Sequence, residues 1–293
     1  VMVKEMAEQD PQIFDELHDT DAIIVRLTKI TRELVEAAHR LKVVARHGVG
    51  FEAVDVEALT DFGGPLTITG DVNSIAVAEH TLALMLSLAK QIIPYDQAVR
   101  KNNFNIRDRF HSSELAGKIV LIAGFGRIGR ATAQRAQAFG MKVQVADPFL
   151  RGDEVERQNC TYVPNFQEGL LSADYVCIHV PKTPQTENLI SFDELKAMKD
   201  PACIVNVSRG GIINEKALVA ALENGWIRGA ALDVFAPEPP RMDHPILEFD
   251  NVVVSPHCGA FTEECAQRMA TACAQSVLDS FRGRFDTNLG LNQ

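Results

Sequence analysis

Three glycines in the middle of the chain have the spacing of a dinucleotide-binding loop. Gly124, Gly126 and Gly129 follow an apolar run that reads as a strand, and a helical pattern begins with them. A second apolar run ends at Asp147, 18 residues after the last glycine. A G-x-G-x-x-G motif alone is weak evidence. A strand before it, a helix after it and an acid at this distance are the context that the dinucleotide fingerprint requires.

The residue types explain how such a loop would bind a cofactor. Gly124 permits the tight turn, Gly126 lets the backbone approach a pyrophosphate, and Gly129 lets helix and strand pack closely. The N-terminus of the helix offers free N–H groups and the positive end of its dipole to phosphates. Asp147 would accept hydrogen bonds from the adenosine ribose and repel a 2′-phosphate, which favours NAD. Arg151 is close enough in sequence to leave NADP open.

Three further residues capable of chemistry follow strand-like runs in the second half of the chain. Arg209, Glu238 and His257 each stand a few residues after such a run. Ligands of open α/β sheets bind outside the carboxyl ends of the strands, so we expect these side chains to converge at one edge. Singly, each residue is more often an ordinary surface side chain or turn. Together, beside a cofactor loop, they predict an active site.

The chemistry of a nicotinamide, hydride transfer with movement of a proton, assigns a role to each of the three. His257 is the natural acid/base, because imidazole titrates near neutral pH. Glu238 would orient the ring and stabilise its protonated form. Arg209 offers a planar fork of donors to a substrate carboxylate and the adjacent carbonyl oxygen. The predicted substrate is therefore a 2-oxo or 2-hydroxy acid.

The elements that must position these residues alternate between strand and helix along the whole chain. Such alternation predicts an α/β protein with parallel sheets covered by helices. A last amphipathic helix is expected at 262–282, and the polar stretch 94–117 is expected to be an irregular connection. The expected strands are Val1–Val3, Ala22–Leu27, Lys42–Ala45, Leu66–Ile68, Ile119–Ala123, Lys142–Ala146, Tyr175–Val180, Cys203–Val207, Ala230–Val234 and Val252–Ser255.

Composition limits the function classes. A length of 293 residues suits two domains, and a net charge of −10 argues against a nucleic-acid or anionic-membrane partner. Six cysteines without a C-x-x-C pair predict reduced thiols in a cytoplasmic protein. The most apolar helix candidate, Ser74–Gln91, carries Glu79 and His80 and is too interrupted to span a bilayer. No metal is predicted.

Several long motifs, in order and over nearly the whole chain, resemble one family. They are RHGVGFEAVDVEA, NSIAVAEHTLALML, ELAGKIVLIAGFGRIG, HVPKTPQT, NVSRGGIINEKAL, GAALDVFAPEP and SPHCGA. The chain resembles the D-isomer-specific 2-hydroxyacid dehydrogenases, which include the D-3-phosphoglycerate dehydrogenases. The resemblance implies NAD as cofactor and carries the family's catalytic triad onto Arg209, Glu238 and His257.

The resemblance also implies further contacts and an architecture. Asp233 would hold the nicotinamide carboxamide, and the Val49 and Gly50 amides would cradle the substrate carboxylate. Two Rossmann/flavodoxin-like domains with a cleft between them are expected, a substrate-binding domain of 1–92 plus 262–293 and an NAD-binding domain of 93–261. Members usually form homodimers through the cofactor domain. The implied cofactor contacts are Thr69, Gly124, Gly126, Arg127, Ile128, Gly129, Asp147, Val180, Pro181, Val207, Asp233 and Gly259.

Departures from the family pattern leave the substrate open. Glu52-Ala53 stands where an Asp-Asn pair is common, Phe104 replaces a frequent Trp, and Cys258 replaces the Ile after the catalytic His. Arg46 could meet a second anionic group of the substrate, or could be only a surface Arg.

Two rival functions use the same fold. One is a formate or phosphite dehydrogenase, although formate enzymes commonly carry Gln at the position of Glu238. The other is a corepressor-like protein that senses NAD, against which the intact triad argues.

Overall fold

The structure, a computed structural model, describes residues 12–109, 111–286, 289–290 and 292. The chain divides into two compact units, unit 1 comprising Val1–Asn73 and Thr262–Gln293, and unit 2 comprising Ser74–Phe261. Helix α4 (Ser74–Lys90) therefore belongs to unit 2, whereas the sequence analysis assigned residues 1–92 to the substrate-binding domain. The reason is that α4 packs against elements of unit 2, namely α6 (Arg127–Ala138), β8 (Cys203–Asn206), β9 (Gly229–Leu232) and β10 (Val252–Val254).

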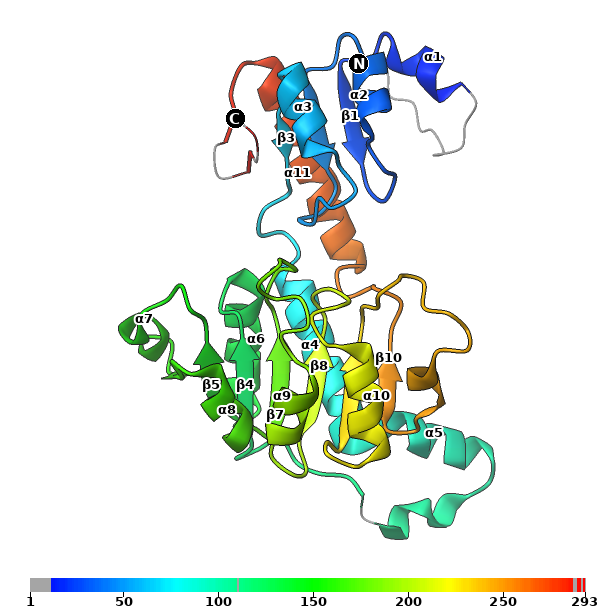
Figure 1. Ribbon diagram of the computed structural model, residues 1–293, viewed down its shortest axis with the longest axis vertical. Helices are drawn as coiled ribbons and strands as arrows, with labels where there is room; N and C mark the ends of the chain where they lie inside the picture. The colour runs from blue at the N-terminus through cyan, green and yellow to red at the C-terminus, as the bar shows by residue number, and fades with distance from the viewer. Residues whose placement is uncertain (1–11, 110, 287–288, 291, 293) are drawn as a thin grey trace. The chain divides into compact units, whose positions relative to one another are not determined.

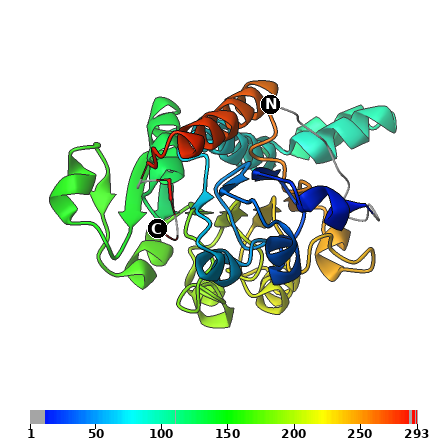
Figure 2. The ribbon, with the colours of Figure 1, turned by 90° about the horizontal axis from the view of Figure 1, so that it is seen from above.

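In its described residues, unit 1 is built on a three-stranded parallel sheet in the order β1-β2-β3. Figure 2 shows α11 on one face of this sheet and α2 and α3 on the other. The expected strand Val1–Val3 lies outside the described residues. The elements are α1 (Ile13–Leu17), β1 (Ala22–Val25), α2 (Arg32–Ala37), β2 (Val43–Arg46), α3 (Val56–Phe62), β3 (Leu66–Thr67) and α11 (Glu263–Phe281).

Local chemistry explains where the helices of unit 1 begin. The Asp55 carboxylate accepts from the Ala58 amide at 2.8 Å, and the Thr262 hydroxyl accepts from the Cys265 amide at 3.1 Å. Such N-caps satisfy amides that have no partner inside the helix. From Thr262, α11 buries Cys265, Met269 and Cys273 on one stripe, at a spacing of four residues, and this helix packs on β2. The last helix thus joins the N-terminal part of the chain.

The described residues of unit 2 contain a seven-stranded parallel sheet in the order β10-β9-β8-β7-β4-β5-β6. The chain starts at β4, runs to one edge and returns to β7, so the strand order reverses between β4 and β7, where such sheets bind ligands. The edge strand β6 was not predicted, because two residues without an apolar run leave no pattern. The strands are β4 (Ile119–Ala123), β5 (Lys142–Ala146), β6 (Thr161–Tyr162), β7 (Tyr175–Ile178), β8 (Cys203–Asn206), β9 (Gly229–Leu232) and β10 (Val252–Val254).

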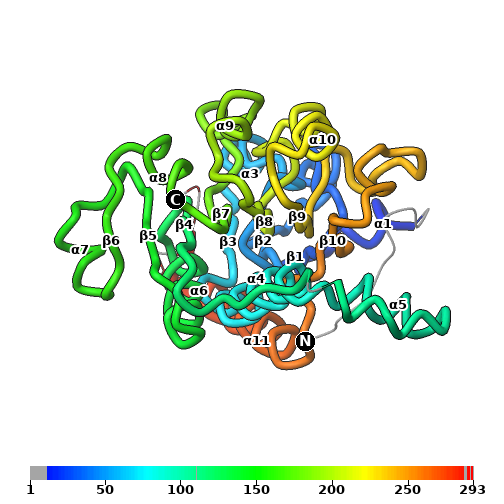
Figure 3. The backbone as a smooth tube through the Cα atoms, turned by 90° about the horizontal axis from the view of Figure 1, so that it is seen from below, coloured from blue at the N-terminus to red at the C-terminus, as the bar shows by residue number. Residues whose placement is uncertain are grey.

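Helices cover both faces of this sheet. Figures 1 and 3 show α4 and α6 on one face and α8, α9 and α10 on the other. Along β4, Val120 and Ile122 enter one hydrophobic core while Leu121 enters the other, as the two-residue period of a strand requires. The helices are α5 (Ile92–Arg100), α6 (Arg127–Ala138), α7 (Gly152–Glu156), α8 (Phe166–Ser172), α9 (Phe192–Ala197) and α10 (Glu215–Glu223), with 3₁₀ turns η1 (Phe104–Arg109) and η2 (Pro245–Glu248).

The connection predicted to be irregular contains regular structure. Residues 92–100 form α5 and residues 104–109 form η1, and in Figures 1 and 3 α5 extends away from the sheet of unit 2. Among the described helices, none alone has the length and apolar character to cross a membrane. The pair α4 and α5 has both together but bends by 58° at the break.

His179 follows β7 at the edge of the sheet where the glycine loop lies. Both of its ring nitrogens are shielded from water and have no hydrogen-bond partner among the described residues. Burial penalises the charged ring and lowers the pKa of His179 to about 4.

This histidine makes the stability of the protein depend on pH. Between pH 6.5 and about 4, the unfolded chain binds a proton at His179 that the folded chain does not. The free energy of unfolding should therefore fall as the pH is lowered through that window, by up to about 3 kcal/mol from this group. Urea unfolding of the wild type and His179→Leu at pH 7, 5.5 and 4.5 measures the effect. The variant should show the weaker pH dependence, and equal dependence would refute the assignment.

Candidate active site

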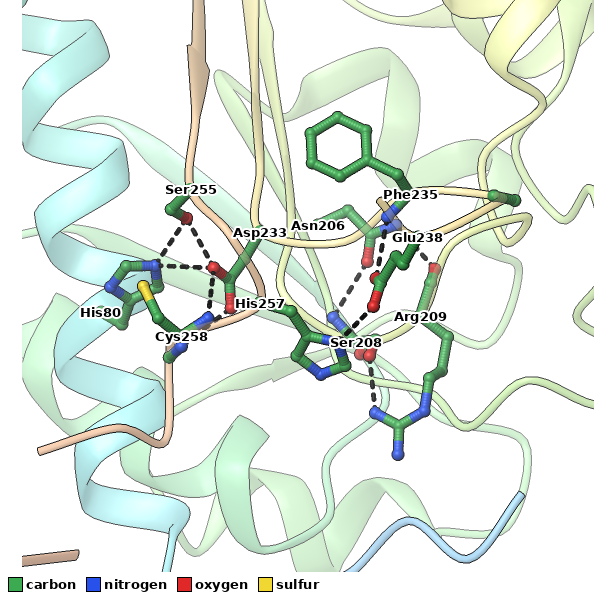
Figure 4. Close-up of polar contacts among 12 residues, drawn as sticks. His80, Asn206, Ser208, Arg209, Asp233, Phe235, Glu238, Ser255, His257 and Cys258 are labelled. Carbon is green, nitrogen blue, oxygen red and sulfur yellow. Dashed lines mark hydrogen bonds and ion pairs between the residues drawn. The ribbon is translucent and has the colours of Figure 1, made fainter. Parts of the chain in front are cut away.

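The loops after β8, β9 and β10 bring together the three residues predicted to do chemistry. The strands are neighbours in the sheet, with β8 paired to β9 and β9 paired to β10 in parallel. Arg209, Glu238 and His257 therefore emerge at the same sheet edge. In Figure 4, His257 and Glu238 point toward each other, with Arg209 beside them.

His257 and Glu238 form a hydrogen-bonded pair. The Nδ1 atom of His257 lies 2.7 Å from Oε2 of Glu238, while Oε1 accepts from the Phe235 amide at 3.0 Å. An ionised carboxylate can only accept, so the proton of the pair is on Nδ1. The Nε2 atom is thereby left to exchange a proton with a bound molecule, and the two side chains are 46% and 36% exposed.

The electrostatics of the pair keep Glu238 ionised. Burial alone would raise the pKa of Glu238. The hydrogen bonds from His257 and the Phe235 amide, with the charges of His257 and Arg209, outweigh burial and hold that pKa below its usual value. A negative carboxylate beside the ring fixes its orientation and its tautomer, which is what an acid/base histidine needs.

Backbone contacts hold Arg209 in its loop. The Asn206 side chain donates to the Arg209 carbonyl and accepts from the Ser208 amide, each at 3.0 Å. The next residue, Gly210, lies so close to the loop after β9 that a Cβ there would be 1.9 Å from the Phe235 carbonyl oxygen. A residue with a side chain would separate the two loops, so Gly210 keeps Arg209 next to Glu238.

Asp233, at the end of β9, is the most buried ionisable residue of the site, with 1% of its surface exposed. Its Oδ1 accepts from the Ser255 hydroxyl at 2.6 Å and the Cys258 amide at 2.9 Å. Its Oδ2 accepts from the Gly259 amide at 2.9 Å. Burial opposes the charge, but the hydrogen bonds from His80, Ser255 and the two amides prevail and lower the pKa of Asp233 to about 2.

The glycine loop has the geometry that its spacing predicted. A Cβ on Gly124 would be 2.7 Å from the His179 carbonyl, and one on Gly129 would be 2.2 Å from the Gly124 carbonyl. A Cβ on Gly126 would meet nothing within 4 Å. Among the described residues, no atom fills that space and no side chain caps α6 at Gly126. The first amides of α6, at Arg127 and Ile128, therefore face an open cradle suited to a pyrophosphate.

Asp147 lies beside this loop. Its Oδ2 accepts from the Phe125 amide at 2.8 Å and its Oδ1 from the Phe149 amide at 2.9 Å. Each oxygen retains capacity for a second hydrogen bond, as binding to ribose hydroxyls requires. Arg151 is paired with Asp153 at 3.1 Å and lies 3.8 Å from Glu154, in the first turn of α7. These acids compete with a 2′-phosphate for Arg151, which supports NAD over NADP.

The other predicted cofactor contacts of unit 2 lie at the same strand ends. A Cβ on Gly124 would approach the Val180 side chain to 2.9 Å, Val207 is buried after β8, and Gly259 binds Asp233. Pro181 accepts from the Thr186 hydroxyl at 2.6 Å. Their contact with a cofactor stays a prediction.

The predicted residues of unit 1 are grouped around the loop after β2. The guanidinium of Arg46 donates to the His47 carbonyl and lies beside Gly48. Thr69 is buried and its amide donates to the Gly48 carbonyl at 3.0 Å, and Val49 and Gly50 are partly exposed. Their roles toward substrate or cofactor stay predictions.

Sequence reasoning missed two members of the site, His80 and Ser255. The Nε2 atom of His80 lies 2.9 Å from Ser255 Oγ and 3.3 Å from Asp233 Oδ1. The signal for His80 was a titratable residue within an apolar helix. The sequence analysis used it to exclude a membrane span and included it in the motif NSIAVAEHTLALML, but gave it no role. Ser255 was placed at the end of the expected strand Val252–Ser255 and was given no role.

His80, Asp233 and Cys258 are close enough to one another to suggest a metal site, since their ligand atoms lie within 4.8 Å. Two observations oppose that reading. The Asp233 carboxylate already accepts hydrogen bonds on both oxygens. Burial, with the nearby Asp233 charge, raises the pKa of the Cys258 thiol, so the thiolate that a metal prefers is disfavoured.

Comparison with known proteins decides the family. Residues 82–259 match the family model described as "D-isomer specific 2-hydroxyacid dehydrogenase, NAD binding domain". The chain belongs to this family. Unit 2 corresponds to its NAD-binding domain, and the open cradle at Gly126, the amides of α6 and the acceptors of Asp147 fit the cofactor.

Individual relatives agree. The D-3-phosphoglycerate dehydrogenase of Methanocaldococcus jannaschii is 40% identical over 95% of this chain and 53% of its own length. The glyoxylate reductase of Korarchaeum cryptofilum is 36% identical over 94% of this chain and 84% of its own. The NAD-dependent formate dehydrogenase of Staphylococcus aureus, solved with NAD, superposes with a TM-score of 0.86 at 30% identity, covering 98% and 87% of the two chains. The chain spans about half the length of the phosphoglycerate dehydrogenases that it matches.

The position of Asp147 predicts how the cofactor is selected. Asp147→Asn keeps the shape of the side chain and removes the charge that would repel a 2′-phosphate. We expect the ratio of kcat/KM for NADH to that for NADPH to fall by about tenfold, as loss of one charged contact implies. The exposed acid Asp193, in the first turn of α9, provides the control Asp193→Asn, which should leave the ratio unchanged. A wild type that prefers NADPH would contradict the role of Asp147.

Proposed function

We propose that the protein transfers a hydride between NAD and C2 of a D-2-hydroxy acid, reversibly giving the 2-oxo acid. The observation that carries this proposal is the His257–Glu238 pair, joined at 2.7 Å and standing beside Arg209 at the strand ends of an NAD-binding domain. A proton donor, a fixed carboxylate and a cation are the three groups that reduction of an oxo acid needs.

Each residue has a defined task in the proposed reaction. Bound NADH supplies the hydride that C2 receives. His257 donates the proton on Nε2 to the carbonyl oxygen as negative charge develops there, and Glu238 stabilises the imidazolium before that transfer. Arg209 binds the substrate carboxylate through two parallel hydrogen bonds and so presents C2 in one orientation. In the direction of oxidation, His257 accepts the same proton from the hydroxyl.

Residues of unit 1 are proposed to determine which class of acid is bound. We propose that the Val49 and Gly50 amides bind the substrate carboxylate together with Arg209, and that Thr69 lies near the cofactor. Arg46, at the end of β2, is proposed to meet a second anionic group, such as a phosphate or a distal carboxylate. The relatives are named for both kinds of acid, since phosphoglycerate carries a phosphate and glyoxylate does not.

A homodimer and a cytoplasmic location are further parts of the proposal. Helix α5 and η1 extend away from the sheet of unit 2 and expose large apolar side chains, Ile92 at 53%, Val99 at 54% and Phe104 at 58%. A second copy of the chain would cover them. The six cysteines are all free thiols and five are buried, which suits a reducing compartment.

The experiment that tests the function is a panel of oxo acids assayed with NADH. The panel contains hydroxypyruvate, phosphohydroxypyruvate, glyoxylate, oxoglutarate and branched-chain oxo acids, with formate and phosphite assayed for oxidation with NAD. We expect at least one oxo acid to be reduced. His257→Ala should lower its kcat by about 10²- to 10⁴-fold, since general acid catalysis contributes that much. Glu238→Gln should lower kcat while leaving the KM for NADH unchanged.

A matched control and two contrary outcomes complete this test. His111 is an exposed histidine of unit 2 whose carbonyl accepts from the Arg228 guanidinium at 2.6 Å. Arg228 directly precedes β9, so His111 lies at the end of the sheet opposite to the strand-end loops, and His111→Ala should retain full activity. Turnover of formate or phosphite alone would replace the proposed substrate class. NADH binding without any turnover, unchanged in His257→Ala, would instead favour a cofactor-sensing protein.

A further inference from the structure

His80 occupies a position on α4 that no catalytic role so far explains. Its imidazole is 21% exposed and faces the strand ends of unit 2, where Nε2 contacts Ser255 and Asp233 (Figure 4). Most neighbours of His80 on the helix are buried and apolar, among them Val77, Ala78, Leu82 and Leu84. A polar ring at this place therefore needs its own explanation.

Counting donors fixes the direction of the hydrogen bonds. Asp233 is ionised and can only accept. The Ser255 hydroxyl, 2.6 Å from Oδ1, must therefore donate its single proton to Asp233. At 2.9 Å on its other side, the Ser255 oxygen has only lone pairs to offer, so Nε2 of His80 carries a proton and donates it. The shorter contact thus runs from His80 through Ser255 to Asp233, the relay of this site, while Nε2 also lies 3.3 Å from Asp233 Oδ1.

The end of this relay is the carboxylate predicted to hold the nicotinamide. Oδ1 of Asp233 is occupied by Ser255 and the Cys258 amide, and Oδ2 accepts from the Gly259 amide. Oδ2 thus retains a lone pair, whereas Oδ1 is saturated. A partial rotation of the carboxylate would turn that lone pair of Oδ2 away from the direction in which it now points.

The same residues hold the turn that carries the acid/base. The Asp233 carbonyl accepts from the His257 amide at 2.8 Å. His257 adopts φ 51°, a left-handed conformation that a residue with a side chain seldom adopts without surrounding support. Ser255, Cys258 and Gly259 bracket His257, and all three bind the Asp233 carboxylate.

We propose that His80 is a positioning residue of the nicotinamide site, acting through Ser255 to hold the Asp233 carboxylate toward the carboxamide and the His257 turn in its left-handed conformation. This inference rests on the proposed function, because it assigns the nicotinamide end of NAD to Asp233. In this proposal His80 acts through Ser255 and Asp233 and not by contact with the reacting atoms.

Two substitutions of His80 distinguish the role of its Nε2 hydrogen-bond donor from the role of the space that its ring fills. A Cβ on Gly259 would lie 3.3 Å from the His80 ring, so the ring fills space against the turn. His80→Phe keeps a planar ring there and removes the Nε2 donor. His80→Gln replaces the ring by a side chain whose amide nitrogen can reach the place of Nε2. Glu79→Gln, at the exposed neighbouring residue that pairs with Arg135, is the matched control.

The experiment measures binding directly, by fluorescence titration with NADH and calorimetry with ADP-ribose, which lacks the nicotinamide. His80→Phe should weaken NADH binding by about tenfold, the effect of removing one partner of a charged hydrogen bond. Its affinity for ADP-ribose should be unchanged. His80→Gln should recover most of the NADH affinity, and Glu79→Gln should match the wild type. Ser255→Ala should resemble His80→Phe, and the double variant should be no weaker than either single one.

Each of the other binding results would contradict one part of the account: the role of His80, the relay, the proposed reaction or the cofactor site. Equal loss of NADH and ADP-ribose in His80→Phe would make the role of His80 purely structural. Unchanged NADH binding in His80→Phe, or no recovery in His80→Gln, would refute the relay. A wild type that binds ADP-ribose and NADH but reduces no oxo acid would refute the proposed reaction and leave the relay standing. A wild type that binds neither would refute the cofactor site itself.

Discussion

The burial of one carboxylate, that of Asp233, is the constraint on which the site depends. A charge with 1% of its residue exposed must find its solvation in protein groups, and here a hydroxyl and two amides supply it. The amides belong to Cys258 and Gly259, so the chain after β10 has to turn toward β9. That turn places His257 at the sheet edge. The same turn therefore solvates the buried charge of Asp233 and places the acid/base residue His257.

The parallel sheet provides the rest of the geometry. Because β8, β9 and β10 are neighbours in register, the loops that follow them deliver Arg209, Glu238 and His257 to one edge. The glycine loop follows β4, two strands away from β8 in the same sheet, and presents the open amides of α6 at that edge. A dinucleotide held by Asp147 at one end and Asp233 at the other would lie along the strand ends.

The sequence predicted those parts of the structure that have a local signature. The glycine spacing, Asp147 and the apolar runs before Arg209, Glu238 and His257 are each readable within a few residues, and the α/β fold follows from the alternation. What depends on tertiary packing was not predictable. Strand β6 is two residues long and exists only because β5 offers an edge. Helix α4 joins unit 2 through contacts with α6 and distant strands, so no feature near residue 73 marks the boundary. His80 meets Ser255 across 175 residues of sequence, and no periodicity encodes that contact.

The central claim is hydride transfer to C2 of an oxo acid with a proton delivered from His257, and isotopic labelling tests it most directly. NADH deuterated at both C4 positions of the nicotinamide is incubated with an accepted oxo acid whose reduced product is chiral, and the hydroxy acid formed is analysed by mass spectrometry and chiral chromatography. The account predicts deuterium bound to C2 of a single product enantiomer, the D form, and loss of that product in His257→Ala. A hydroxy acid without deuterium at C2, a racemic or L product, or oxidation of NADH with no reduced acid would contradict it.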